Sequence, residues 1–231
     1  MRENRGYRSV ILCALFLLAG ACYSRPVSLK VVTKEYKSKH YERLFETWSR
    51  EGQAYNLDTL ENSLKVSATY LSWEMRQVYV ARYAYDYGLD EKAKTEMLKK
   101  EREAFDRTNE FVVAATASEK KWAQFRRPDS PWKITLLTSE GVEVLPDEIN
   151  SIHRPSPMLA AYFKYITIYR EVFRFYFPLD EHETLAPVLS PRLTSFSLVF
   201  KGALGRVELK WRVESEGKPD KGAAATTSIF Q

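Results

Sequence analysis

The chain is poor in the residues that build catalytic and metal sites. Its 231 residues include two cysteines, three histidines and nine glycines. A disulfide framework needs several cysteine pairs, and phosphate-binding loops need closely spaced glycines. We find no Gly-x-Ser-x-Gly elbow, no His-Glu-x-x-His pair, no phosphate loop and no dinucleotide fingerprint. The sequence therefore predicts no catalytic residue, no metal site and no cofactor, and it favours a protein that is not an enzyme.

One histidine stands beside carboxylates. His182 follows Asp180 and Glu181 and precedes Glu183. Such a group can hold zinc or calcium. The spacing, however, matches neither a helical zinc pair nor a calcium loop with its central glycine. We interpret residues 180–183 as a solvated acidic loop between strands.

The charge of the chain is modest and evenly spread. Its formal net charge is +5, and removal of residues 1–21 leaves 32 basic and 29 acidic residues. Nucleic-acid binding requires a concentrated basic face. The basic residues here are interleaved with acidic ones, so no nucleic-acid partner is predicted.

The first 22 residues have the layout of an export signal. Three arginines precede a short apolar run over residues 10–18, and small residues follow it. The run is about half as long as the roughly 20 residues that a membrane-spanning helix needs. Ala19 and Ala21 would suit an ordinary signal peptidase that cuts before Cys22, which leaves a secreted or soluble periplasmic protein as one alternative.

The segment Ala19-Gly20-Ala21-Cys22 resembles the lipobox of bacterial lipoproteins, in which small residues and a cysteine follow the apolar run. Ala19 stands where most members of that family have leucine. The resemblance implies cleavage between Ala21 and Cys22 and a diacylglycerol on the Cys22 thiol. It covers residues 1–22 only. It also accounts for a lone cysteine in the mature chain, where no disulfide partner would remain.

The same resemblance implies a place in the cell envelope. In Gram-negative bacteria such lipoproteins reach the outer membrane unless aspartate follows the cysteine, and here Tyr23 follows. The domain would then face the periplasm; in a Gram-positive organism it would lie outside the plasma membrane. Two or more acyl chains make such anchoring stable. The expected partners are the membrane and a protein of the envelope.

The remaining chain is predicted to be a single domain. Residues 22–33 are expected to form a tether, 34–215 the domain and 216–231 a disordered tail. The domain begins with an amphipathic helix that carries an aromatic stripe over Tyr41 to Trp48 and ends at Gly52.

A helical hairpin is expected over residues 72–107. Ser72 can cap its first helix, Gly88 can end that helix, and Asp90 can start the second one. The stretch LKVSATY just before it alternates like a strand, which places the hairpin inside a sandwich. The rival interpretation divides the chain at Arg126-Arg127-Pro128 into a helical half and a sandwich half.

Seven short strands are expected, separated by turn signals and prolines. They cover residues 63–72, 110–117, 132–138, 142–152, 166–178, 195–200 and 206–213. Because each strand has one apolar face to bury, they close most simply into two packed sheets. The predicted fold class is α+β: a seven-stranded Ig-like antiparallel β-sandwich with an inserted helical hairpin and one preceding amphipathic helix.

Tyrosines are the other unusual feature. Tyr79, Tyr83 and Tyr87 recur every four residues on the first hairpin helix. They can pack against the sandwich, or they can form an exposed patch that binds a protein or a glycan. The sequence thus favours a non-catalytic envelope lipoprotein that acts as a structural or interaction module. The alternative is a periplasmic glycan-binding protein or cell-wall hydrolase that uses these rings and the acidic loop.

Overall fold

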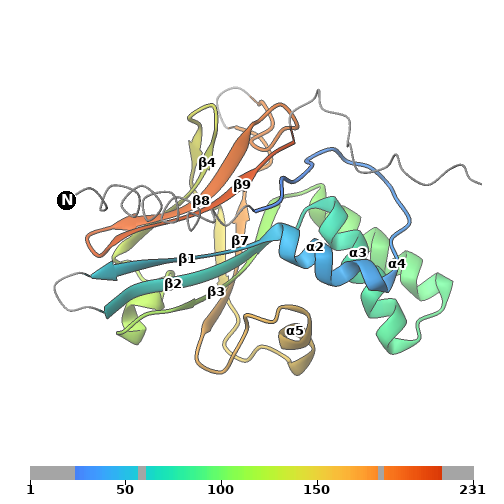
Figure 1. The fold of residues 1–231 in the computed structure, drawn as a ribbon, viewed down its shortest axis with the longest axis horizontal. Helices are drawn as coiled ribbons and strands as arrows, with labels where there is room; N and C mark the ends of the chain where they lie inside the picture. The colour runs from blue at the N-terminus through green and yellow to red at the C-terminus, as the bar shows by residue number, and fades with distance from the viewer. Residues whose placement is uncertain (1–23, 57–60, 182–184, 215–231) are drawn as a thin grey trace, which may run out of the picture.

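The strands form two antiparallel sheets in the computed structural model, which describes residues 24–56, 61–181 and 185–214 (Figure 1). The larger sheet has the order β1-β2-β3-β7-β6, and the smaller one the order β5-β4-β8-β9. The strands are β1 (Ser49–Asn56), β2 (Glu61–Tyr70), β3 (Asn109–Thr116), β4 (Trp132–Thr138), β5 (Glu143–Val144), β6 (Glu148–Ser151), β7 (Glu171–Phe177), β8 (Ser195–Gly202) and β9 (Gly205–Arg212). The helices are η1 (Ser38–His40), α2 (Tyr41–Trp48), α3 (Trp73–Tyr87), α4 (Glu91–Phe105), η2 (Lys120–Ala123) and α5 (Pro157–Tyr162). The expected α+β arrangement with two antiparallel sheets is confirmed.

Aromatic side chains fill the space between the sheets. Along β9, buried residues alternate with exposed ones, as in a half-buried strand. Trp211 of this strand stacks on Phe196 of β8 with ring centroids 5.1 Å apart, and it lies 5.7 Å from Phe111 of β3. Its indole N–H donates to the carbonyl of Trp48 over 2.9 Å. The core therefore connects both sheets to the end of α2.

The described residues contain nine strands rather than the seven expected. The sequence did not predict β1. In the structure α2 ends at Trp48, and Ser49, with an extended backbone, begins the strand. The prediction of a helix that continues to Gly52 is therefore wrong. Gly52 lies in β1 where this strand approaches β9, and a Cβ atom there would come within 2.9 Å of Val207 and Leu209. The glycine permits the two sheets to pack closely.

Two further strand predictions are wrong in part. Residues 142–152 form two short strands, β5 and β6, which belong to different sheets. Pro146 lies between them and cannot donate a hydrogen bond to a ladder. Residues 166–178 form a strand only over β7, Glu171–Phe177.

The helix α5 was also not expected. Ser156 accepts the N–H of Leu159, and Pro157 occupies the first turn, so this proline-containing stretch between two predicted strands carries a helix start. The loop after α5 lies on the outer face of the larger sheet. There the hydroxyl of Tyr165 bonds Thr69 Oγ1 over 2.9 Å and donates to the carbonyl of Val112 over 2.8 Å.

The helical hairpin lies between β2 and β3 as expected. Ser72 and Asp90 accept backbone N–H groups of the first turns of α3 and α4 over 3.1 and 2.7 Å. Gly88 ends α3 with a left-handed φ of 59°. Because β2 pairs with β3 and β3 with β7, strands before and after Arg126 share one sheet. A division of the chain at that point is not observed.

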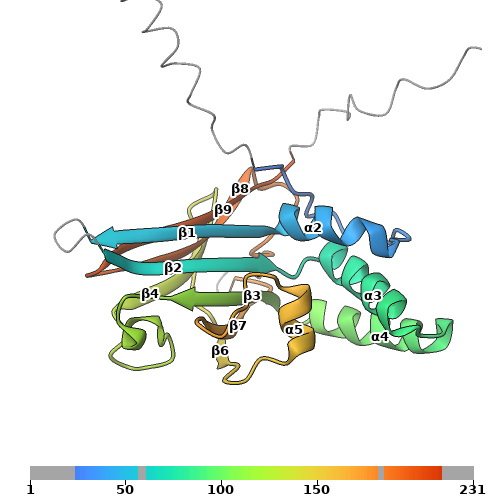
Figure 2. The same ribbon diagram turned by 60° about the horizontal axis from the view of Figure 1, so that its bottom comes forward.

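The first and last described segments lie side by side (Figure 2). Val27 forms a parallel bridge with Val213 and is 1 % exposed. Its N–H donates to the carbonyl of Arg212 over 2.8 Å, and its carbonyl accepts the N–H of Glu214. The segment 22–33, expected to be a tether, is thus attached to the body at Val27.

Three predictions lie outside the described residues: the export signal over 1–21, the acylated Cys22 and the disordered tail over 216–231. Within the ranges that the structure does describe, no helix has both the length and the apolar character needed to cross a membrane.

Candidate functional site

The three tyrosines of the sequence pattern form a row on α3 that faces α5. The rings of Tyr83 and Tyr87 stack at 4.5 Å with planes 25° apart, and Tyr79 lies 6.2 Å from Tyr83. Tyr162 of α5 packs 5.2 Å from Tyr79 and 6.1 Å from Tyr83. Tyr79 and Tyr83 are half-buried, whereas Tyr87 is exposed. The row therefore combines packing with one accessible ring.

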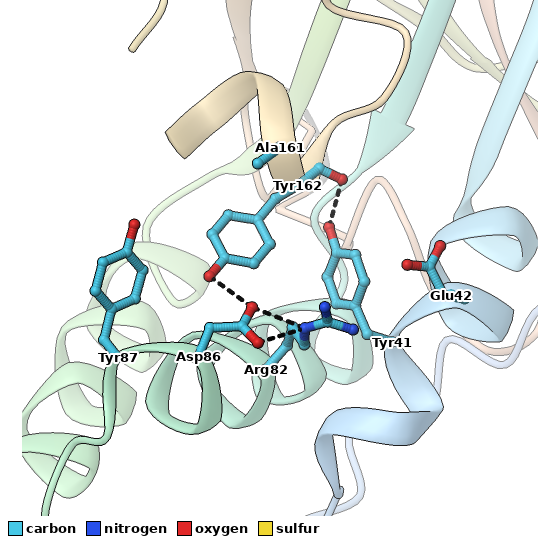
Figure 3. A pocket seen from close by; sticks show the side chains of 7 residues that line it. All are labelled: Tyr41, Glu42, Arg82, Asp86, Tyr87, Ala161 and Tyr162. Carbon is cyan, nitrogen blue, oxygen red and sulfur yellow. Dashed lines mark hydrogen bonds and ion pairs between the residues drawn. The ribbon is translucent and has the colours of Figure 1, made fainter. Parts of the chain in front are cut away.

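A hollow of about 360 Å³ opens beside this row, between α2, α3 and α5 (Figure 3). Its lining residues are Tyr41 and Glu42 of α2, Arg82, Asp86 and Tyr87 of α3, and Ala161 and Tyr162 of α5. Three helices far apart in the sequence thus build it. Of the three tyrosines predicted to form a binding patch, only Tyr87 lines the hollow itself.

Hydrogen bonds link the three helices around the hollow (Figure 3). The Nε of Arg82 donates to both oxygens of Asp86 over 3.0 and 2.7 Å. The hydroxyl of Tyr162 donates to Asp86 Oδ2 over 3.1 Å. The hydroxyl of Tyr41 donates to the carbonyl of Tyr162 over 2.7 Å. These bonds hold α2, α3 and α5 in a defined arrangement.

Three tyrosine hydroxyls around the hollow, those of Tyr41, Tyr79 and Tyr162, have raised pKa values. Burial raises the pKa of Tyr162 well above its usual value, and the hydrogen bond to Asp86 and its negative charge act in the same direction. Burial also raises the pKa of Tyr41, and it raises that of Tyr79 to about 12. The hydrogen bond to Asp86 raises the pKa of Arg82. The hydroxyls of Tyr41 and Tyr162 therefore act as hydrogen-bond donors, to the carbonyl of Tyr162 and to Asp86.

Both carboxylates of the hollow are ion-paired. Asp86 pairs with Arg82, and Glu42 pairs with Lys164. A glycoside hydrolase needs one carboxyl group that retains its proton and a second that is free to act on the sugar or on water. Ion pairs on both acids do not provide that arrangement. A hollow with balanced charge beside tyrosine rings suits a neutral polar ligand with an apolar face.

The acidic loop lies apart from the hollow. Asp180 forms an isolated bridge with Pro187, and neither Asp180 nor Glu181 lines the hollow. His182 and Glu183 lie outside the described residues. In the part of the chain that the structure describes, no three His, Cys, Asp or Glu side chains gather as potential metal ligands.

A largely buried group of four charged side chains, which sequence reasoning missed, fastens the hairpin to the larger sheet. Glu110 of β3 is 3 % exposed and pairs with Arg76 of α3 over 2.5 Å and with Arg174 of β7. Arg76 also pairs with Glu101 of α4 over 2.5 Å. Burial alone would lower the pKa of Arg174, but the charge and hydrogen bond of Glu110 outweigh it and raise the pKa. A charged residue within or beside an apolar run could have indicated this group in the sequence. Glu and Arg are rarely buried without a partner, so such a residue predicts a buried ion pair.

No family model, curated protein or solved structure matches the chain.

Proposed function

We propose that the protein is a non-catalytic lipoprotein of the bacterial cell envelope, an interaction module held to the membrane through an acylated Cys22. The observation that carries this proposal is the short distance along the chain between Cys22 and the start of the folded body. Val27 is bonded to the end of β9 only five residues after Cys22. Five residues span at most about 18 Å when extended. A lipid on Cys22 would thus hold this end of β9 near the bilayer surface.

The lipobox-like segment 19–22 supports the anchor, and Tyr23 in place of aspartate supports the inner leaflet of the outer membrane. The body would then face the periplasm. The ion pairs of the hollow support a role without catalysis. The two antiparallel sheets support a sandwich; its likeness to the Ig fold stays a prediction.

Mass spectrometry of the exported protein's N-terminus tests the anchor. We expect the mass of an acylated Cys22. The substitution Cys22→Ala should move the protein from the membrane fraction to the soluble fraction with an unchanged Tm, because Cys22 precedes the first bonded residue of the body. Cys13→Ala is the matched control, since this cysteine lies in the part to be removed. A mature chain that begins with an unmodified Cys22 thiol refutes the anchor.

The tyrosine row favours a second candidate function, the binding of a cell-wall glycan. Sugar rings present an apolar face that packs on aromatic side chains, and their hydroxyls accept and donate hydrogen bonds. The stacked pair Tyr83 and Tyr87 supplies such a face beside a hollow of balanced charge. The ion pairs on Asp86 and Glu42 favour binding over hydrolysis.

Calorimetric titration with soluble peptidoglycan fragments tests this second function. We expect Tyr87→Ala to weaken binding roughly 3- to 10-fold through the loss of one ring contact. Tyr85→Ala is the matched control, because Tyr85 is exposed on the same helix but does not line the hollow. Absence of binding, or equal losses in both variants, rejects the glycan role. Release of reducing ends that Asp86→Asn abolishes would indicate hydrolysis instead.

A further inference from the structure

A second hollow, of about 310 Å³, lies where the loop after η2 meets the edge strand β6 and the start of β7; we call it the basic hollow. It shares no residue with the hollow beside the tyrosine row. Its wall carries three cations but a single carboxylate. Its polar lining residues include Lys120, Arg126, Arg127, Ser151, His153 and Glu171.

The carboxylates at and beside the basic hollow are already paired. They form ion pairs as follows: Glu171 with Lys120 over 3.1 Å, Glu119 with Lys121 over 2.6 Å, and Asp129 with Arg127 over 2.8 Å. Within the described ranges, no carboxylate forms a salt bridge with Arg126. Exposed ion pairs contribute little free energy, so an incoming anion can share their cations. Arg126 is therefore the cation in excess at this hollow.

The wall of the basic hollow offers more hydrogen-bond donors than acceptors. The guanidinium of Arg126 carries five N–H groups in a planar fork that fits the oxygens of a phosphate. Arg127 bonds Asp129 through its Nε and Nη2, so its Nη1 takes no part in that pair. Ser151 and His153 add a hydroxyl and a ring N–H. A phosphate monoester presents three acceptor oxygens and a charge of about −1.5 to −2, which suits this wall better than the two oxygens and single charge of a carboxylate.

A third hollow, of about 280 Å³, adjoins the basic hollow and shares Lys120 and Glu171 with it; we call it the apolar hollow. Small side chains from β3 and η2 line it, together with Ile168 and Tyr169. These two neighbours are 90 % and 83 % exposed, the highest values among the large hydrophobic side chains of the described residues. Adjacent exposed apolar side chains at the rim of a hollow are typical of a binding site.

We propose that the basic and apolar hollows together bind one ligand, a phosphate ester whose organic part carries a ring or another apolar group. The phosphate lies against Arg126, and the apolar group packs against Ile168 and Tyr169. The ion pair between Lys120 and Glu171 forms the shared wall, so the Lys120 ammonium reaches the phosphate from the other side. Neither hollow alone accounts for both the excess cation and the exposed apolar pair.

The position of these hollows keeps them accessible in an anchored protein. Figure 2 shows β6 on the side of the body away from the first and last described segments. With the proposed lipid at Cys22, the basic hollow would face away from the bilayer and toward soluble or cell-wall molecules. The binding of the phosphate ester itself does not depend on the anchor.

Calorimetric titration of the purified protein with phenyl phosphate, inorganic phosphate and benzoate tests the proposal. At about pH 7.5 and constant ionic strength, both phosphates are mostly dianions. We expect phenyl phosphate to bind most tightly, because it reaches both hollows. Inorganic phosphate lacks the ring, and benzoate has the ring but only one charge and two oxygens. A preference for phenyl phosphate over inorganic phosphate identifies an ester rather than the free ion as the ligand.

Two variants separate the two ends of the ligand. Arg126→Gln should weaken the binding of both phosphates about 10-fold or more, because hydrogen bonds between charged groups are lost. Tyr169→Ala should weaken phenyl phosphate about 3- to 10-fold and leave inorganic phosphate unchanged, because only a ring contact is removed. Arg43→Gln is the matched control. Arg43 is exposed on α2, lines neither hollow and should not affect binding.

Several outcomes would overturn the proposal. Absence of phosphate binding, or benzoate that binds as tightly as phenyl phosphate, rejects the phosphate site. Equal losses in Arg126→Gln and Arg43→Gln show only a general attraction of anions to a basic protein and reject it as well. If Tyr169→Ala leaves phenyl phosphate unaffected, the two hollows do not share a ligand. None of these titrations involves Cys22, so their failure would leave the proposed anchor intact.

Discussion

The two faces of the larger sheet are built in different ways. The inner face carries phenylalanine rings in mutual contact: Phe175 lies 6.0 Å from Phe173 and 6.1 Å from Phe200 of β8. The outer face, beneath the helices, carries the Glu110 and Arg174 pair and a network of hydroxyl groups. Apolar burial is non-directional, whereas a buried polar network depends on each of its bonds. The inner face thus holds the sheets together, and the outer face positions the helical hairpin and the loop after α5.

The largest expected effect is on the inner face. Trp211→Ala should lower the free energy of unfolding by about 3–5 kcal/mol, because it removes a buried ring from between the sheets. Urea denaturation measures this loss. Lys210→Ala, at an exposed position of the same strand, should stay within about 0.5 kcal/mol. A Tm that does not change in the Trp211 variant contradicts the core as described.

On the outer face, Glu110→Gln should lower the free energy of unfolding by about 3 kcal/mol, because two arginines lose their shared carboxylate. Hydrogen exchange should accelerate in α3 and α4 more than in β8, since this carboxylate fastens the hairpin. Glu91→Gln is the control: its pair with Lys94 is exposed and should contribute under about 1 kcal/mol. Uniform acceleration across both sheets would show that the two faces are not separate in the way proposed.

A smaller loss, about 1–2 kcal/mol, is expected for Tyr165→Phe. The substitution keeps the ring but removes the hydroxyl that bonds Thr69 and the carbonyl of Val112. Tyr169→Phe, at a position that is 83 % exposed, should change stability by less than about 0.5 kcal/mol. Equal changes in stability for the two variants would show that the hydroxyl network does not stabilise the outer face.

The smallest expected effect is a loss of stability at alkaline pH, which is absent at neutral pH. Tyrosines with raised pKa values occur on both sides of the larger sheet; they are Tyr36, Tyr41, Tyr70, Tyr79, Tyr162, Tyr165 and Tyr176. Above pH about 10 the unfolded chain loses these protons while the folded chain retains them. The stability they contribute is thus complete below pH 10 and declines as pH rises through 12. Tyrosinate absorbance near pH 10 that corresponds to all 14 tyrosines of the chain, without unfolding, would contradict this.

The sequence predicted those elements whose signals are local. Alternation identified β8 and β9, and the caps at Ser72 and Asp90 placed the hairpin. The strand β1 escaped because its residues SREGQAYN do not alternate in hydrophobicity. It forms through pairing with β2 and packing against β9, both non-local.

The site shows the same division. Spacing on one helix was enough to group Tyr79, Tyr83 and Tyr87. The hollow beside them needs Asp86 to meet Tyr162, a residue 76 positions later that belongs to an unexpected helix. No local sequence pattern predicts such a long-range contact.

The first and last described segments of the body lie side by side, so the folded body is nearly circular in its connectivity. Because Val27 and Val213 are paired, a short linker could join the first and last described segments without moving β9. Such a circularised chain could be reopened at the turn around Gly88, where an added Cβ would meet no atom within 4 Å. Every strand pairing would survive this rearrangement, so the order of the segments along the chain is separable from the fold they build.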